Sequence, residues 1–328
     1  MKKLTATLLF SAAVLTASIS AHAKTYRLAT NTVENAITGY LIQDFVEGVA
    51  EKTDNRVKIR VSWNGVLGTQ SQYLQAMQIG VIDMGMINSA TLETLAPEIG
   101  VINLPYIFRS KEEYGLVLNN PDIQEMINSY VADSGLLQIG YLSNGFRSIY
   151  AAKPMKSIDD VKGLKLRTLS SDSYIKMINL FGAVPTPLPF GEVYPSLQQK
   201  IIDGAEGGLS ALWDLKFGEV AKYGLKTEQT RLTDFILASK KFMDKLSPED
   251  REIVLSEMKR VSSKSIETID ENIEERTKIA VEKMGVEIHE VDKTPFIEAV
   301  KPMYVDAMND DKKKAFIEKI FELENREM

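Results

Sequence analysis

A long stretch without glycine or proline constrains the fold of this chain more than any other feature of the sequence. Ser247 to Asp250 combine an N-cap serine, a proline at the first helical position and early acids, which predicts a strong helix start. Apolar residues then recur every three to five positions until Gly285. A helix of about 38 residues would be roughly 57 Å long, more than one small lobe. We therefore expect it to run across two lobes, and the lack of sustained heptads makes a coiled coil the weaker interpretation.

The first 23 residues have the pattern of a secretory signal peptide. Two lysines follow Met1, an apolar stretch covers 8–15, and Ala21-His22-Ala23 ends the segment with small residues. The apolar stretch is too short to span a bilayer, which takes about 20 residues. We expect export across the inner membrane, cleavage after Ala23, and a soluble, monomeric periplasmic protein that begins at Lys24.

The length and the order of elements predict two α/β lobes. About 305 residues would remain after cleavage, which exceeds what one hydrophobic core usually supports. A strand at 26–30, a helix at 36–52 and a strand at 57–63 open the chain, and a second cycle begins near 137–142. Loss of the two lysines moves the net charge from −6 to −8, which disfavours nucleic acid as a partner.

Enzyme chemistry lacks most of its usual residues here. His289 would be the one histidine left after cleavage, and it lies among alternating residues that are typical of a strand. The chain has no cysteine, which excludes a lipoprotein anchor, disulfides and thiolate chemistry. It has neither a P-loop nor a dinucleotide fingerprint, so we expect no cofactor and no metal site. Chance carboxylate pairs are unavoidable among 45 acidic residues, so we predict a non-enzymatic protein.

A series of motifs makes the prediction more specific. The first group is Asn144-Gly-Phe-Arg147, Lys153-Pro and Asp160-Val-Lys-Gly-Leu-Lys-Leu-Arg167. The second group is Gly182-Ala-Val-Pro-Thr-Pro, Phe190-Gly-Glu-Val-Tyr194 and Ile202-Asp-Gly-Ala-Glu206, with Val66-Leu-Gly68 and Gly80-Val-Ile-Asp-Met84 upstream. In this order they resemble the TRAP-transporter solute-binding proteins of the DctP type, over essentially the whole expected mature chain.

The resemblance implies a two-lobed periplasmic binding protein fold with a central ligand cleft and a long helix spanning both lobes. Chain crossings expected near Asn144, near Leu232 and along the long helix place 24–145 and 233–272 in the first lobe. They place 146–232 and 273–328 in the second lobe. The implied partners are a small organic acid and the membrane-embedded subunits of a TRAP permease.

Two arginines are the expected contacts of the ligand carboxylate. Arg167 ends the Lys-Gly-Leu-Lys-Leu-Arg motif, in which the family grips the carboxylate. A guanidinium presents a planar fork of donors that matches two carboxylate oxygens, whereas lysine offers a point charge. The alternative for Arg167 is a surface arginine that covers a strand end. Arg147 lies in the family's second basic position, and its alternative role is a structural salt bridge.

Neutral polar residues are expected around the rest of the ligand. Asn31 matches a first-lobe polar contact of the family. Gln70 and Asn88 align by motif spacing with positions that carry acids in the sialic-acid binders, and an amide replaces the charge with a donor and an acceptor. Ser170 follows Arg167 as a second-lobe contact. Each of these four side chains has a turn or capping role as its alternative.

Three positions near the second-lobe motifs bear on the shape of the cleft. The resemblance assigns Phe190 to an aromatic wall, although a lone phenylalanine is usually core. Gly207 departs from the family, because many relatives have an asparagine there, so the pocket would lack one amide. The sequence leaves open whether Glu206 and Trp213 line the cleft.

These residues favour a sugar acid such as a uronate as the ligand. Two arginines with amides and serines suit one carboxylate surrounded by hydroxyl groups. A C4-dicarboxylate is the runner-up, with each arginine binding one carboxylate. Sialic acid is disfavoured by Gln70, Asn88 and Gly207. Presentation of the ligand to a sensor kinase is the alternative from another functional class.

Overall fold

The strands of the computed structural model, which describes residues 24–326, form one nine-stranded mixed sheet. The expected signal peptide, 1–23, lies outside the described residues. The strands are β1 (Lys24–Ala29), β2 (Val57–Ser62), β3 (Met84–Asn88), β4 (Leu136–Ala151), β5 (Lys165–Thr168), β6 (Val184–Pro187), β7 (Gly204–Gly207), β8 (Tyr223–Ser239) and β9 (Glu287–Glu290). Their order is β2-β1-β3-β8-β4-β7-β5-β6, and β9 pairs with β8.

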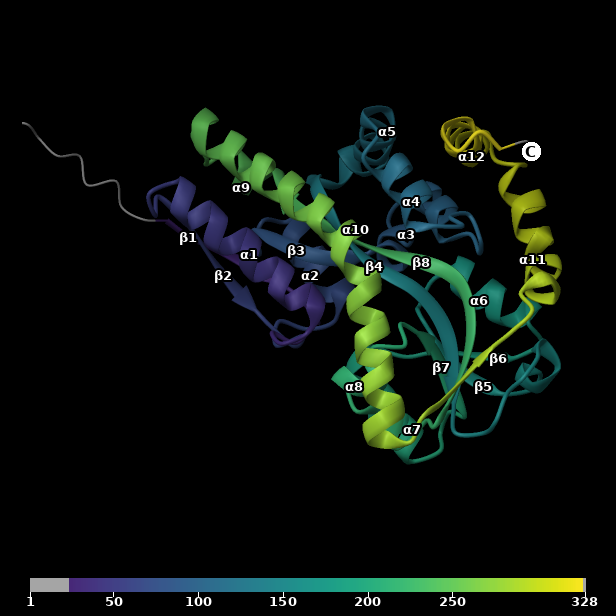
Figure 1. The fold of residues 1–328 in the computed structure, drawn as a ribbon. Coiled ribbons are helices and arrows are strands. Elements are labelled where there is room, and N and C mark those ends of the chain that lie inside the picture. Colours follow the sequence, from purple (N-terminus) through teal and green to yellow (C-terminus); the bar gives the residue numbers. More distant parts are fainter. Residues whose placement is uncertain (1–23, 327–328) are drawn as a thin grey trace, which may run out of the picture.

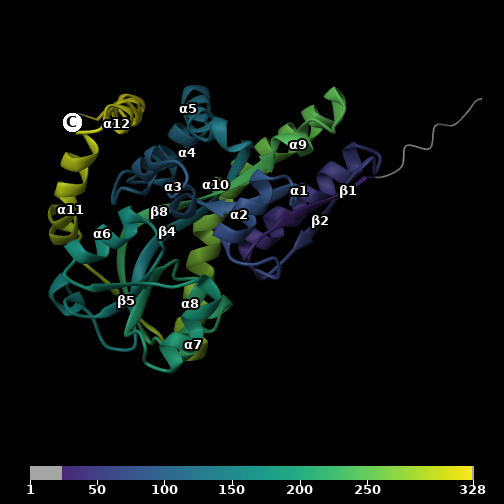
Figure 2. The same cartoon turned by 180° about the vertical axis from the view of Figure 1, so that it is seen from behind.

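Helices cover this sheet and connect its strands (Figures 1 and 2). The α-helices are α1 (Ile37–Lys52), α2 (Gln70–Gln78), α3 (Ser89–Glu93), α4 (Lys111–Leu118), α5 (Pro121–Val131), α6 (Asp172–Leu180), α7 (Val193–Gln198), α8 (Ala211–Asp214), α9 (Lys240–Met243), α10 (Pro248–Met284), α11 (Thr294–Ala307) and α12 (Asp311–Leu323). The 3₁₀ helices are η1 (Pro97–Asn103), η2 (Ala132–Ser134), η3 (Ile158–Val161), η4 (Phe190–Glu192) and η5 (Phe217–Glu219). No helix within 24–326 combines the length and the apolar character that a membrane span requires.

Two long strands join the two lobes. β4 and β8 pair antiparallel from Leu136 opposite Ser239 to Ala151 opposite Tyr223. One end of β8 pairs with β3 in the lobe that contains β1, β2, α1 and α2, which we call the first lobe. The other end of β4 pairs with β7 in the lobe that contains β5, β6 and α6 to α8, the second lobe. The two-lobed α/β architecture expected from the sequence is therefore confirmed, and the exact boundaries between the lobes stay a prediction.

The pairing of the two joining strands, β4 and β8, is irregular where they pass between the lobes. The register of β4 against β8 shifts between Ser143 and Phe146. Gly145 in this bulge has a φ of 70°, and a Cβ there would overlap the side chain of Ile273 in α10. A glycine is therefore required at this position, because it is the residue that adopts positive φ without a steric penalty.

Helix α10 spans both lobes, as the sequence predicts. It has 37 residues, Ser247 caps its start by accepting a hydrogen bond from the Asp250 backbone N–H, and Gly285 ends it in the left-handed conformation. It packs against α1 and β4 and, further along, against α8 (Figure 1). Two of its serines contact the joining strand β4. The hydroxyl oxygens of Ser262 and Ser265 accept hydrogen bonds from the Tyr141 and Ser143 backbone N–H groups, at 3.1 and 3.0 Å.

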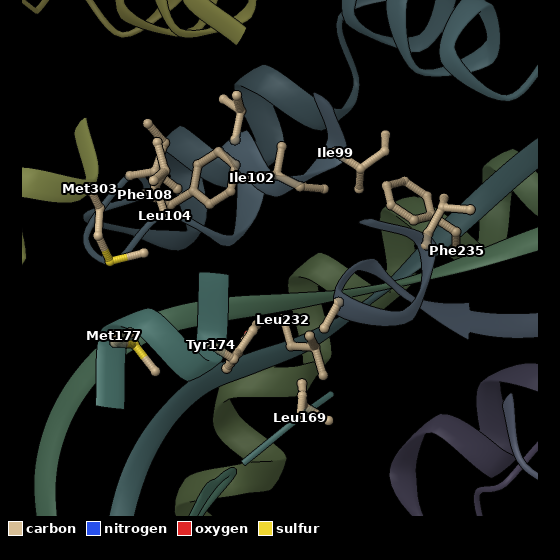
Figure 3. Packing of buried hydrophobic residues seen from close by; sticks show 14 of the residues in the cluster. Ile99, Ile102, Leu104, Phe108, Leu169, Tyr174, Met177, Leu232, Phe235 and Met303 are labelled. Carbon is tan, nitrogen blue, oxygen red and sulfur yellow. The ribbon is translucent and has the colours of Figure 1, made fainter. Parts of the chain in front are cut away.

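Three hydrophobic cores stabilise the molecule. One core lies in the first lobe under α1 and α10, and a second lies in the second lobe around Phe217. The largest core joins elements that are far apart in the sequence. Figure 3 shows Ile102 of η1 and Met303 of α11 facing Met177 of α6 and Leu232 of β8.

Several helices were not expected from the sequence. α4, α5, α11 and α12 lie in regions to which the motif pattern assigned no element. The C-terminal helix α12 packs near η1 and α5, where Lys312 pairs with Glu98 at 2.9 Å and the rings of Phe316 and Tyr130 are 5.8 Å apart. These contacts depend on chain segments about 200 residues apart, so local periodicity carries no signal for them.

The close approach of α10 to β4 gives a stability prediction. A Cβ at Gly140 would overlap the Met258 side chain and lie 3.0 Å from the Ser262 hydroxyl oxygen. Overpacking of this kind costs about 1 to 3 kcal/mol, so Gly140→Ala should lower the free energy of unfolding by that amount. Gly115→Ala is the matched control, because its Cβ would meet Ile266 of the same helix at an ordinary 3.5 Å. Urea unfolding measures both variants, and equal stabilities would contradict the packing.

Candidate ligand-binding site

A cavity of about 570 Å³ lies between the first and second lobes. Its walls come from the segment after β1, the start of α2 and the end of β3 on one side, and from β5, η4 and β7 on the other. The joining strands β4 and β8 contribute residues between these walls. All eight residues that the sequence nominated for ligand contact line this cavity: Asn31, Gln70, Asn88, Arg147, Arg167, Ser170, Phe190 and Gly207. Their contact with a ligand stays a prediction.

The side-chain amide of Gln70 connects Asn31 with the backbone of Asn88. The Gln70 side-chain amide donates to Asn31 Oδ1 at 3.0 Å, and its carbonyl oxygen accepts from the Asn88 backbone N–H at 2.9 Å. Asn88 caps α3, because its Oδ1 accepts from the Thr91 backbone N–H at 2.7 Å. Asn88 therefore has a capping role through its oxygen, Gln70 holds Asn31 in position, and ligand contact by either side chain stays a prediction. The side-chain N–H₂ groups of Asn31 and Asn88 keep no protein acceptor among the described residues.

Arg147 forms a buried ion pair. Its Nε and Nη2 donate to the two carboxylate oxygens of Glu206 at 2.6 and 2.9 Å, and Nη2 also donates to the Glu206 carbonyl oxygen at 3.0 Å. Glu206 is fully buried and lines the cavity. Burial disfavours the charged guanidinium, but the Glu206 charge and its hydrogen bonds together outweigh that effect and raise the pKa of Arg147. The structural alternative for Arg147 is thus present in the fold.

Arg167 is buried without an anionic partner. The residue is 3% exposed. Its Nε and Nη2 both donate hydrogen bonds to the Leu188 carbonyl oxygen, at 3.1 and 2.9 Å. Within 24–326 its Nη1 has no hydrogen-bond acceptor and no carboxylate forms an ion pair with it. The guanidinium lies 5.9 Å from the centre of the Phe190 ring. Burial lowers the pKa of Arg167, and the nearby charge of Glu206 opposes this effect without outweighing it.

Tyr150 is a lining residue that sequence reasoning missed. A Cβ at Gly207 would lie 2.9 Å from the Tyr150 hydroxyl oxygen, so the absence of a side chain at Gly207 leaves room for this hydroxyl. The hydroxyl has no hydrogen-bond partner in the described part of the chain, and burial raises the pKa of Tyr150 to about 12. The polar group that Gly207 lacks is therefore replaced from the neighbouring strand β4.

Asp234 is a second lining residue that was missed. It lies on β8 opposite Asn88 of β3, and its Oδ2 accepts a hydrogen bond from the Asn144 side-chain amide at 2.6 Å. No sequence signal singled it out, because β8 also contains the ionisable residues Lys226, Glu228 and Arg231. Trp213, which the sequence left open, packs against the second-lobe core.

Comparison with known proteins places the chain in a family. Residues 28–311 match the family model described as bacterial extracellular solute-binding protein, family 7. The 2,3-diketo-L-gulonate-binding periplasmic protein of Escherichia coli is 27% identical over 300 residues, which cover 90% of each chain.

Solved structures of TRAP periplasmic solute-binding proteins have the same fold. One from Anaerococcus prevotii, with bound α/β-D-glucuronate, is 31% identical with a TM-score of 0.87 and covers 92% of this chain and 98% of its own. One from Xanthobacter autotrophicus, with bound β-D-galacturonate, is 32% identical with a TM-score of 0.85 and covers 90% and 98%.

The Arg147–Glu206 pair predicts a large stability change on removal of one partner. Glu206→Gln would leave a buried guanidinium without its charge partner, which costs about 3 to 5 kcal/mol. Urea unfolding without ligand should show a loss of this size. Glu298→Gln removes the same charge from an exposed pair with Lys301 on α11 and should change stability little. An equal change in the free energy of unfolding for the two variants would contradict a buried ion pair between Arg147 and Glu206.

Proposed function

The chain belongs to the bacterial extracellular solute-binding proteins of family 7, and we propose that its ligand is a uronate or a related sugar acid. It is a TRAP periplasmic solute-binding protein, a non-enzymatic class that works with TRAP permease subunits. The observation that carries the proposal is the buried guanidinium of Arg167, which lacks an anionic partner among the described residues. A ligand carboxylate would supply that partner through two parallel hydrogen bonds.

The pairing of Arg147 favours a ligand with one carboxylate. A C4-dicarboxylate would use each arginine for one of its carboxylates, but Arg147 already holds Glu206 in a two-point contact. Binding of a second carboxylate at Arg147 would bring two anions together in a buried site. A single carboxylate at Arg167 avoids this repulsion.

The remaining lining suits a hydroxylated carbon skeleton. Asn31 and Asn88 keep free side-chain donors, and the Tyr150 hydroxyl and Ser170 add neutral polar groups. Phe190 offers an apolar face beside Arg167. The solved relatives with bound glucuronate and galacturonate support the same ligand class. We infer that the lobes close on this ligand by a hinge motion about β4, β8 and α10.

Export is the second part of the proposal. The family is periplasmic, and 1–23 has the order of charges and apolar residues of a signal peptide. The protein recovered from the periplasm should therefore start at Lys24 and behave as a monomer. Intact-mass measurement of the exported protein checks the start, and a mass that includes Met1 to Ala23 would contradict cleavage.

Arg167 gives the direct test of the proposed ligand contact. Arg167→Ala should weaken binding of D-galacturonate or D-glucuronate by roughly thirtyfold to several thousandfold, because loss of one partner of a buried charged pair costs about 2 to 5 kcal/mol. Arg167→Lys should recover part of the affinity, since lysine keeps the charge and loses the fork. Calorimetric titration measures the dissociation constants, with circular dichroism as the check of folding.

Arg60→Ala is the matched control for this experiment. Arg60 is an exposed arginine of β2, so its removal takes away one positive charge without touching the cavity. The control should bind uronate like the unchanged protein. Near-identical dissociation constants for all variants would refute Arg167 as the anchor and transfer that role to Arg147.

A further inference from the structure

Asp234 places a second uncompensated charge in the cavity. The residue is 2% exposed and lines the cavity from the first-lobe end of β8. Its Oδ2 accepts from Asn144, while its Oδ1 accepts no hydrogen bond from any residue of 24–326. This oxygen is open to the cavity, where water or a ligand can donate a hydrogen bond to it. The structure therefore supplies a charged acceptor that a ligand hydroxyl group can use in place of water.

The groups around Asp234 do not neutralise it. Arg147 on β4 is the cation whose charge acts on it, and Glu206 already pairs with Arg147. The charge of Asp234 also acts on Tyr73 of α2 and Tyr114 of α4, and burial raises the pKa of both, so they stay neutral. Burial raises the pKa of Asp234 to about 6, so the carboxyl is mostly ionised at neutral pH and protonates as the pH falls through that value.

Asp234 and Arg167 lie at different ends of the ligand space. In the sheet order, β8 and β5 are separated by β4 and β7. The register also places Arg167 level with Gly224 of β8, which lies ten residues before Asp234 along the same strand. Both side chains line the same cavity, so a ligand whose carboxylate meets Arg167 has its other end toward Asp234. An acceptor at that end fits hydroxyl groups and repels an anion.

We propose that Asp234 is a specificity-determining residue, which accepts hydrogen bonds from hydroxyl groups at the ligand end opposite the carboxylate and excludes a second carboxylate there. This inference rests on the proposed function, because it assumes that Arg167 holds a sugar acid. It narrows the ligand class to polyhydroxy mono-acids. Sugar diacids with the same carbon skeleton are excluded by the charge of Asp234.

The test compares two acids of one six-carbon skeleton that differ in the group at C1. Because D-galacturonate closes to a ring and galactarate stays open, the change in preference caused by Asp234→Asn carries the test. D-Galacturonate carries one carboxylate, whereas galactarate carries one at each end of the same six-carbon skeleton. Calorimetric titration of the full-length mature protein should give clearly tighter binding of galacturonate. Asp234→Asn should weaken galacturonate binding by roughly tenfold to a hundredfold, because hydrogen bonds to a charged group are the stronger ones. The same variant should bind galactarate at least as well as the unchanged protein, so the preference for the mono-acid falls.

Asp122→Asn is the matched control for charge. Asp122 is an exposed residue at the start of α5 that pairs with Lys319, so this variant loses one negative charge far from the cavity lining. It should keep the preference for galacturonate. An equal loss of preference in Asp122→Asn and Asp234→Asn would assign the effect to net charge and overturn the proposal.

A measurement on the unchanged protein covers the case in which Asp234→Asn does not fold. Between about pH 8 and about pH 5 both ligands stay ionised, while Asp234 gains its proton. The affinity for galactarate relative to galacturonate should rise as the pH falls, and a constant ratio would overturn the proposal.

If Asp234→Asn folds and binds both acids unchanged while Arg167→Ala does not bind, Asp234 loses its role and the proposed function stands. If the unchanged protein binds neither acid, the proposed function fails, and this inference with it.

Discussion

Arg147 and Arg167 are both buried against one cavity, and Glu206 pairs with the first of them alone. Removal of a guanidinium from water is costly unless an anion or several oxygen acceptors replace the water. Arg147 meets this condition inside the protein, whereas Arg167 has the Leu188 carbonyl oxygen and the face of Phe190. The second lobe therefore holds a positive charge that a ligand carboxylate can neutralise. Selective binding of an acid follows from this imbalance.

The joining strands explain how residues far apart in the sequence come to face one ligand. β4 carries Arg147 next to Glu206 of β7, and β8 carries Asp234 next to Asn88 of β3. Two serines of α10 accept hydrogen bonds from the β4 backbone at Tyr141 and Ser143, just before the register shift, and so attach the helix to this strand. The same three elements connect the lobes. A change in the angle between the lobes would therefore act directly on the cavity walls.

Motif order predicted part of this arrangement, because some of the motifs contain residues that line the cavity, among them Arg147, Arg167 and Phe190. Arg167 and Gly207 could be nominated in this way, as could the long helix from its capping residues. Asp234 and Tyr150 could not, because their place in the cavity depends on strand pairing and on the space left at Gly207. The pairing of Arg147 with Glu206 likewise joins residues 59 positions apart. A sequence pattern identifies such residues but does not predict which of them pair in the fold.

The most direct test of the central claim is an experimental structure of the protein with D-galacturonate or D-glucuronate bound. The account predicts that the ligand carboxylate makes two hydrogen bonds with the guanidinium of Arg167, while Arg147 remains paired with Glu206. A carboxylate bound to Arg147 with Glu206 displaced, or a uronate outside the cavity between the lobes, would contradict it.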